Sequence, residues 1–528
     1  MAKSLKNLLS QTVIYGMSSI IGRFLNYLLV PLYTYKIAAA SGGYGVVTNL
    51  YAYTALILVL LTFGMETTFF RFSRQEDGEA PNPKVFSTSA LAVGFVSLLF
   101  VLLVTIFLGP ISNALHYQAH PEFVEIMAII VGMDAFQAIL FARLRSENRA
   151  WKFAALKLSF IICNIALNLF IFLVVPKIYM NCPHLLGWYD PSYQVGYIFI
   201  LNLICTAGVM LGFIPEMKAL RYGVDFQLLK KMLNYTWPLL LLGIAGILNQ
   251  VADKICYRFI VPGLEGEVQL GIYGACVKIA MIMAMITQAF RYAYEPFVFS
   301  GKRDQADKQQ QADVMKYFII ATLFAFLAVM CYIDVFKYII RRDYWDGLRA
   351  VPIVMMAEIF MGIYFNLSFW YKTTDRVKNG VKQGYQTYWG AIFSGIGCVV
   401  LLAINFLFVP KFGYMACAWA GFAGYGVCML LSYFVGQKRA PIPYKVVPIL
   451  LYFVVALALY ALTRCVHPQS IVLELVINTL ILCIYVAFVL FMERKVVKVA
   501  ANSIKAKLHK RLVHDNFSSG RKCKVFRR

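Results

Sequence analysis

Residues 85–108 read VFSTSALAVGFVSLLFVLLVTIFL, a run without a charged side chain. A hydrocarbon core of about 30 Å is crossed by a helix of about 20 apolar residues, so this run predicts a transmembrane helix. About fourteen stretches meet the same requirement. They lie near 12–35, 45–69, 85–108, 122–141, 153–175, 194–214, 236–260, 271–293, 317–338, 351–371, 387–409, 414–435, 446–463 and 471–492. The sequence therefore predicts an all-α polytopic membrane protein with about 14 transmembrane helices.

The overall composition agrees with that fold. The chain has 528 residues, of which 60% are hydrophobic and 14% charged, and its mean hydropathy is +0.68. A soluble protein needs roughly 25% charged residues to cover its surface. The segments between the predicted helices are too short for a soluble domain.

The distribution of Lys and Arg predicts the orientation in the membrane. With the N-terminus in the cytoplasm, the inner segments hold about 36 basic residues and the outer loops about five. The five are Lys177, Arg341, Arg342, Arg349 and Lys411. This asymmetry places both termini in the cytoplasm, and it explains a net charge of +24 without a nucleic-acid partner. The basic tail 493–528 is expected to contact anionic lipid headgroups, with docking of a partner as the alternative.

Two halves of the chain resemble one another. Residues 44–70 (YGVVTNLYAYTALILVLLTFGMETTFF) align with residues 273–299 (YGACVKIAMIMAMITQAFRYAYEPFVF), and Glu66 corresponds to Glu295. The preceding RFLNYLLVP (23–31) aligns with KICYRFIVP (254–262). Because six helices separate the copies, the two lobes are expected to run parallel. Transporters with such repeats place the substrate between the lobes and alternate access by rocking.

The repeat gives the expected domain boundaries. They are 1–222 for an N-terminal six-helix lobe, 223–440 for a C-terminal six-helix lobe, 441–492 for helices 13–14 and 493–528 for the basic cytoplasmic tail.

Several polar side chains lie inside the predicted spans. A basic residue at the centre of a membrane helix costs about 2.5–3.5 kcal/mol on insertion scales, so it usually faces water or a partner. Arg23 and Asn26 share one face of the first helix, and Lys278 has no acid one turn away. Lys254 and Arg291 add further cations, and together these residues predict a cavity that binds an anion such as phosphate.

Simpler interpretations remain open for several of these positions. Asp253 and Lys254 are adjacent and could form a structural ion pair, as could Arg291 with Glu295 near the inner surface. Lys157 lies close enough to the cytoplasmic boundary to extend its ammonium group into the headgroup region. The acids inside the spans are Asp134, Asp253 and Glu358.

The sequence carries no recognised signature of a cofactor or metal site. The 12 cysteines fit no zinc spacing, and most of them lie in apolar helices. No Gly-x-x-x-x-Gly-Lys phosphate loop is present. We therefore expect no cofactor and no metal.

The polar start of helix 1 (SQTVIYGMSSIIGRFLNYLLVPLYT), YGVVTNLYAYTALILVLLTFGMETTFFRF, and ADKICYRFIVPG…LGIYGACVKIA followed by AFRYAYEPF carry a family resemblance. The chain resembles the polysaccharide biosynthesis proteins, the lipid-linked oligosaccharide flippases for O-antigen and capsule. These belong to the multidrug/oligosaccharidyl-lipid/polysaccharide exporter superfamily. The resemblance covers nearly the whole chain. It implies a multi-pass protein of the bacterial cytoplasmic membrane that moves undecaprenyl-diphosphate-linked oligosaccharide between leaflets and is not an enzyme.

The resemblance also assigns expected roles to residues and partners. Arg23, Asn26, Lys254, Lys278 and Arg291 would contact the substrate, and Asp134, Asp253 and Glu358 would couple transport to an ion. A polysaccharide polymerase and glycosyltransferases are the implied partner enzymes, with the monomer as the working unit.

Two functions of other kinds remain as alternatives. An ion-coupled drug/cation antiporter of the same superfamily would prefer unpaired acids to bases in its cavity. A membrane polymerase or glycosyltransferase would need a large outer loop, whereas the longest one here is 176–193. A purely structural protein would not need cations at mid-membrane.

Overall fold

In the computed structural model, the described residues are 27–73, 83–300, 305–373, 375–378, 381–385, 388–466 and 470–494. Within them, 13 helices are long and apolar enough to cross a membrane. Each coincides with one predicted span, from the second to the fourteenth, so these thirteen predictions are confirmed. Most of the first predicted helix lies outside the described residues, and only its end is seen.

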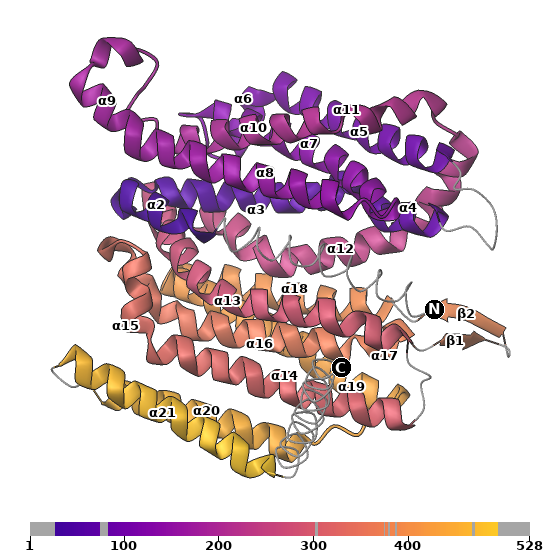
Figure 1. Ribbon diagram of the computed structural model, residues 1–528, viewed down its shortest axis with the longest axis vertical. Helices are drawn as coiled ribbons and strands as arrows, with labels where there is room; N and C mark the ends of the chain where they lie inside the picture. Colours follow the sequence, from indigo (N-terminus) through magenta and orange to yellow (C-terminus); the bar gives the residue numbers. More distant parts are fainter. Residues whose placement is uncertain are drawn as a thin grey trace, which may run out of the picture. The chain divides into compact units, whose positions relative to one another are not determined.

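Long helices running side by side form the N-terminal half (Figure 1). Ala135 and Ile139 of α7 are completely buried, and Phe141 packs edge-on against Phe153 and Phe213. The elements are α2 (Leu29–Lys36), η1 (Ala39–Ser41), α3 (Gly43–Thr62), α4 (Met65–Ser73), α5 (Pro83–Ile106), α6 (Leu108–Ala114), α7 (Pro121–Ser146), α8 (Ala150–Leu169), η2 (Phe170–Val174), α9 (Val175–Asn181), η3 (Pro183–Leu186), α10 (Gln194–Gly212), α11 (Ile214–Met217) and η4 (Lys218–Tyr222).

The C-terminal half begins with a helix of 35 residues, α12. Asp225 caps it by accepting hydrogen bonds from the backbone N–H groups of Gln227 and Leu228 at 3.1 and 3.0 Å. The elements are α12 (Phe226–Ile260), α13 (Leu264–Ser300), α14 (Gln305–Cys331), α15 (Ile333–Phe336), η5 (Lys337–Ile339), η6 (Arg342–Ala350), α16 (Val351–Leu367), α17 (Phe369–Thr373), β1 (Asp375–Lys378), β2 (Val381–Tyr385), α18 (Tyr388–Phe412), α19 (Tyr414–Arg439), α20 (Val446–Cys465) and α21 (Ile471–Met492). The strands β1 and β2 pair as an antiparallel hairpin, which projects from the helices in Figure 1. They are the two strands found among the described residues.

The two repeated segments fold differently at one point. Phe63 and Gly64 take φ values of 51° and 67°, which separate α3 from α4. A positive φ is uncommon for phenylalanine because its Cβ then crowds the backbone, and glycine avoids that cost. The corresponding part of α13 continues through Ser300 without a break. Ala293 stands there in place of Gly64, and alanine favours a continuous helix.

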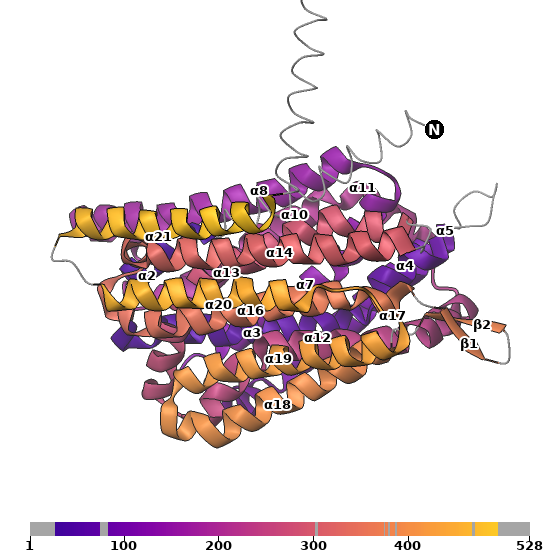
Figure 2. The same cartoon turned by 90° about the horizontal axis from the view of Figure 1, so that it is seen from below.

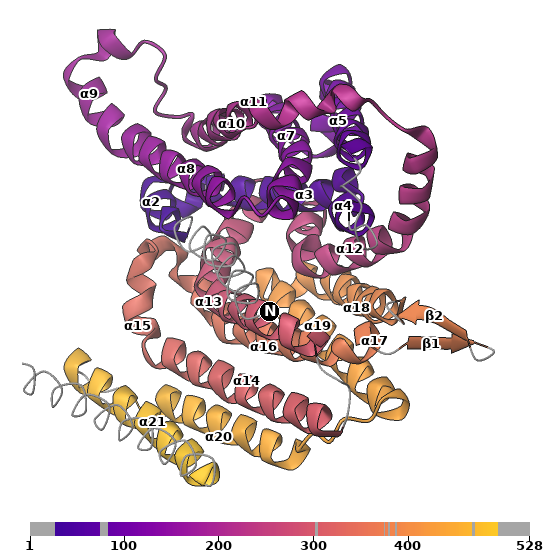
Figure 3. The same ribbon diagram turned by 45° about the vertical axis from the view of Figure 1, so that its right-hand side comes forward.

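Two compact units can be distinguished. The smaller one contains Lys316–Ile333 of the α14 region together with the chain from Tyr444 onward, and α14, α20 and α21 lie next to one another in Figures 2 and 3. Asn478 donates a hydrogen bond to the carbonyl oxygen of Cys331 at 2.7 Å. The larger unit contains both predicted lobes except this helix, and the lobe boundaries remain a prediction.

Candidate functional site

Three helices of the C-terminal half contribute the residues that we call the central cluster: Asp253, Lys254, Tyr273, Lys278 and Glu358. Asp253 and Lys254 come from α12, Tyr273 and Lys278 from α13, and Glu358 from α16. A further helix, α19, packs against α16 and α12. All five residues lie within helices long and apolar enough to span the membrane.

A closed ion pair forms one side of the central cluster. The Nζ atom of Lys254 lies 3.0 Å from both carboxylate oxygens of Asp253. The hydroxyl group of Tyr273 donates to Asp253 Oδ2 at 2.9 Å, and Lys254 also donates to the carbonyl oxygen of Gln250 at 3.0 Å. The Asp253 side chain is 7% exposed and that of Lys254 17%. The adjacent positions in the sequence thus form the pair that the sequence suggested.

The other side of the cluster is not closed. Lys278 forms no ion pair or hydrogen bond with any residue of the described chain, and the charge of Lys254 repels it. The same charge attracts Glu358, whose Oε2 atom is buried without a hydrogen-bond partner among the described residues. The Tyr425 hydroxyl group of α19 is also buried without a hydrogen-bond partner among the described residues. Buried polar groups without partners cost free energy, so they favour a ligand that would satisfy them.

The remaining predicted substrate contacts are only partly visible. The guanidinium carbon of Arg291 lies 3.7 Å from the ring centroid of Phe365 in α16, a cation–π contact. The side chain of Glu295, its expected ion-pair partner, lies outside the described residues, as do Arg23 and Asn26.

Asp134 belongs to a separate cluster in the N-terminal half. It interacts electrostatically with Lys157 of α8 and with Tyr51 of α3, whose hydroxyl oxygen accepts a hydrogen bond from Asn202 at 2.6 Å. The Nζ atom of Lys157 lies 4.2 Å from the ring centroid of Phe141 in α7. Lys157 therefore contacts the neighbouring helix, and its extension to the headgroup region stays a prediction.

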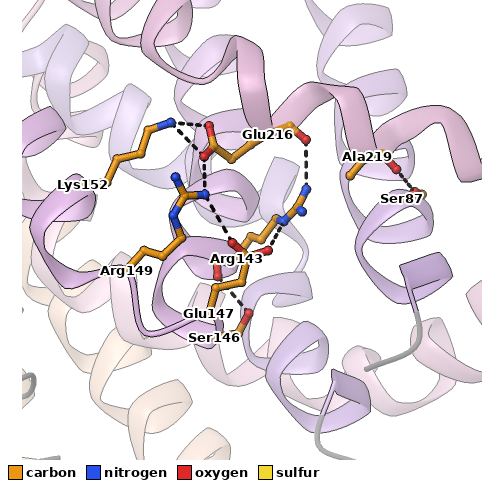
Figure 4. Close-up of polar contacts among 8 residues, drawn as sticks. All are labelled: Ser87, Arg143, Ser146, Glu147, Arg149, Lys152, Glu216 and Ala219. Carbon is orange, nitrogen blue, oxygen red and sulfur yellow. Dashed lines mark hydrogen bonds and ion pairs between the residues drawn. The ribbon is translucent and has the colours of Figure 1, made fainter. Parts of the chain in front are cut away.

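A second group of charges lies between α7, α8 and α11, and we call it the cytoplasmic cluster after the side of the membrane that the sequence predicts for it: Arg143, Glu147, Arg149, Lys152 and Glu216. The Glu216 side chain is 1% exposed and accepts hydrogen bonds from Arg149 at 2.6 Å and from Lys152 at 2.6 and 2.8 Å (Figure 4). Arg143 donates to the carbonyl oxygen of Glu216 at 2.9 Å and to Glu147 at 2.6 Å. Every charge of this cluster has a partner.

Burial and ion pairing shift the pKa of the Glu216 carboxyl group in opposite directions. Burial alone would raise the pKa of its carboxyl group, but the hydrogen bonds from Lys152 and the charges of Lys152 and Arg149 hold that pKa below its usual value. Sequence reasoning missed Glu216. The signal was a lone acid after the sixth predicted helix, on the same predicted side as the basic segment ARLRSENRAWK.

Among the residues that the structure describes, no group of three or more His, Cys, Asp or Glu side chains could hold a metal ion.

No known protein family and no curated protein matches the sequence. Solved structures do match. "Lipid II flippase MurJ, inward closed conformation" has a TM-score of 0.67 and 14% identity, over 92% of this chain and 100% of MurJ. An inward-facing multidrug resistance MATE family transporter of the MOP superfamily has a TM-score of 0.58 and 14% identity, over 79% of this chain and 94% of its own. The MATE multidrug transporter DinF-BH has a TM-score of 0.56 and 15% identity, over 83% of this chain and 96% of its own.

These matches show the fold. The chain is a multi-pass, all-α membrane protein with the fold of the MOP exporter superfamily, to which the sequence resemblance also pointed. The matched structures are transporters and a flippase.

Proposed function

We propose that this chain is a flippase that moves undecaprenyl-diphosphate-linked oligosaccharide repeat units from the cytoplasmic to the outer leaflet. Access alternates between the two lobes, and the diphosphate passes a cationic central cavity. The chain would work in the bacterial cytoplasmic membrane, without enzymatic activity of its own, next to the polymerase and glycosyltransferases that use and make its cargo.

The observation that carries the proposal is the unpaired ammonium group of Lys278. Within the described chain it has no carboxylate partner, although it lies in a span where a cation costs about 2.5–3.5 kcal/mol. A phosphate group would compensate that charge through charge-assisted hydrogen bonds. Lys254 adds a second cation nearby, and Arg23, Asn26 and Arg291 are the further proposed substrate contacts.

The extent of the structural matches also favours a flippase. The MurJ match covers 92% of this chain, whereas the two MATE matches cover 79% and 83%. The fold of the MATE transporters therefore matches a smaller part of this chain than the fold of MurJ does.

The acids of the central cluster suggest how transport is driven. Asp253 and Glu358 both interact with Lys254, so protonation or ion binding at either acid would change the charge that the cargo meets. Asp134 is the proposed coupling acid of the N-terminal half. A membrane potential of 100 mV supplies about 2.3 kcal/mol for each elementary charge that moves.

Depletion of the protein tests the proposal. Undecaprenyl-diphosphate oligosaccharide should accumulate on the cytoplasmic leaflet, surface polysaccharide should be lost, and mass spectrometry of the lipid would identify the sugars. Wild type and the Lys438→Gln control, which removes an exposed charge of α19, should restore export, and Lys278→Gln should not.

The opposite result would favour the antiporter. If lipid intermediates stay normal while sensitivity to cationic drugs rises, Asp253 and Glu358 would be the binding acids for a cationic cargo and the flippase proposal would be wrong.

A further inference from the structure

Arg258 lies at the outer end of α12, and only 4% of it is exposed. Its Nη2 atom donates to Glu267 Oε1 at 2.5 Å and to the carbonyl oxygen of His116 at 2.9 Å. Its guanidinium carbon lies 4.0 Å from the ring centroid of Tyr117. Glu267 belongs to α13 of the C-terminal half, whereas His116 and Tyr117 belong to the outer loop between α6 and α7. One side chain therefore connects the two halves.

The contact extends from Arg258 into a third helix. The Tyr117 hydroxyl group donates to Asn49 Oδ1 at 2.8 Å, and Asn49 donates to the carbonyl oxygen of Lys254 at 2.7 Å. Asn49 is on α3 and is 1% exposed. The network thus joins α3 and the loop of the N-terminal half to the backbone of the central cluster.

Close packing of α3 against α13 surrounds this network. A Cβ atom on Gly45 would overlap the carbonyl oxygen of Glu267, and one on Gly271 would lie 2.9 Å from the backbone nitrogen of Gly45. Glycine at both positions allows the two helices to approach this closely. Nearby, the Tyr344 hydroxyl group of η6 donates to the carbonyl oxygen of Ile37 at 2.9 Å. The outer ends of the two halves are therefore in direct contact.

The closed arrangement leaves part of Arg258 unsatisfied. Its Nε and Nη1 atoms are buried without a hydrogen-bond partner among the described residues. His116, which accepts from Arg258, takes a φ of 61°, an uncommon conformation for a residue with a side chain. Unsatisfied donors and local backbone strain both make a contact easier to open.

We propose that Arg258, Glu267 and Tyr117 form a latch that holds the outer side closed and opens in each transport cycle. The proposal rests on alternating access, whichever cargo is carried. In the closed state the guanidinium group is shared by both halves. When the outer ends separate, it loses His116 and Tyr117, keeps Glu267 on its own half, and its unsatisfied N–H groups reach water.

A cysteine accessibility measurement tests the latch without any cargo. The reporter is Thr48→Cys in the full chain, because Thr48 of α3 faces Gly274 of α13. Cys182 and Cys465, both exposed, are replaced by serine, and the same background with Thr48 intact gives the signal of the other cysteines. A membrane-impermeant maleimide is added from outside to intact cells.

Arg258→Ala should raise the labelling rate of the reporter about tenfold, which corresponds to about 1.4 kcal/mol. Glu267→Gln and Tyr117→Leu should raise it less, because each affects only one of the three contacts of the Arg258 guanidinium group. Arg349→Ala is the matched control: it removes a cation of the same predicted side whose side chain is 77% exposed, and should leave the rate unchanged. The double change Arg258→Glu with Glu267→Arg should bring the rate back toward that of the parent.

Equal labelling of the parent, Arg258→Ala and Glu267→Gln would overturn the latch. If Arg258→Ala does not elute as a folded protein in detergent, Glu267→Gln and Tyr117→Leu decide the question. Failure of the flippase proposal would appear in the lipid profile, and it would leave these labelling rates as they are.

Discussion

The cytoplasmic cluster and the central cluster use the same kinds of charged side chain in opposite ways. Around Glu216, every cation has a partner, and the group lies at the ends of the spanning helices, with Glu216 itself outside them. Around Lys254, one ion pair is closed, while Lys278 and one oxygen of Glu358 have no partner among the described residues. The satisfied cluster stabilises the fold. The unsatisfied cluster costs stability, so we attribute a function to it.

Asp253→Asn should have the largest effect, because it breaks the closed pair of the central cluster. It leaves the Lys254 ammonium group, which is 17% exposed, without its carboxylate. Breaking such a pair costs about 3–5 kcal/mol of unfolding free energy. Thermal unfolding in detergent and export activity should both decline. An unchanged melting temperature would show that the pair is not structural.

Lys278→Gln should reduce transport and leave stability unchanged or slightly higher. Loss of a hydrogen bond to a charged group costs about 1.5–3 kcal/mol, so export should fall about tenfold to a hundredfold. Export per molecule of folded protein is the measurement, and Lys278→Arg should restore part of it. Full activity of Lys278→Gln would remove Lys278 from the substrate path.

Glu216→Gln should give the reverse pattern. It weakens the bonds from Arg149 and Lys152 and should cost about 1–2 kcal/mol of unfolding free energy, because both cations are partly exposed and can be hydrated. Export per folded molecule should not change. A transport defect without a loss of stability would mean that the two clusters do not differ as described.

The stabilisation by Glu216 should also depend on pH. The folded state lowers the pKa of the Glu216 carboxyl group. Its contribution to the free energy of unfolding is therefore complete above pH 4.5, the pKa of this group in the unfolded chain. It is lost as the pH falls through the lower folded pKa. The melting temperatures of wild type and Glu216→Gln should therefore differ at neutral pH and converge in strong acid.

Arg349→Ala should have the smallest effect. The Arg349 and Asp346 side chains are 77% and 55% exposed and lie 3.5 Å apart. Exposed pairs contribute about 0–1 kcal/mol, so neither the melting temperature nor export should change measurably. A clear loss of export would place Arg349 in the substrate path.

Much of the fold could be read from the sequence. The second to fourteenth predicted helices all coincide with described helices, because in lipid the backbone must satisfy its own hydrogen bonds. The break at Phe63 and Gly64 was not predicted, since one glycine in an apolar run does not normally end a helix. The grouping of α14 with α20 and α21 was not predicted either, because the internal repeat assigned that helix to a lobe.

The candidate site was only partly readable. Asp253 and Lys254 are neighbours in the sequence, so their pairing could be suggested from it. The interaction of Glu358 with Lys254 joins residues about a hundred positions apart and depends on how α16 packs against α13 and α19. The Arg258 latch depends in the same way on an outer loop of the other half.

The sequence by itself was enough to identify a membrane protein, its helices and the costly charges within the spans, and it predicts the orientation. Hydrophobic length and the positions of Lys and Arg depend on local composition alone. Only the tertiary structure decided which charges are satisfied. Partners such as Glu216 with Lys152, or Arg258 with Tyr117, meet through helix packing, and no local pattern in the sequence specifies that packing.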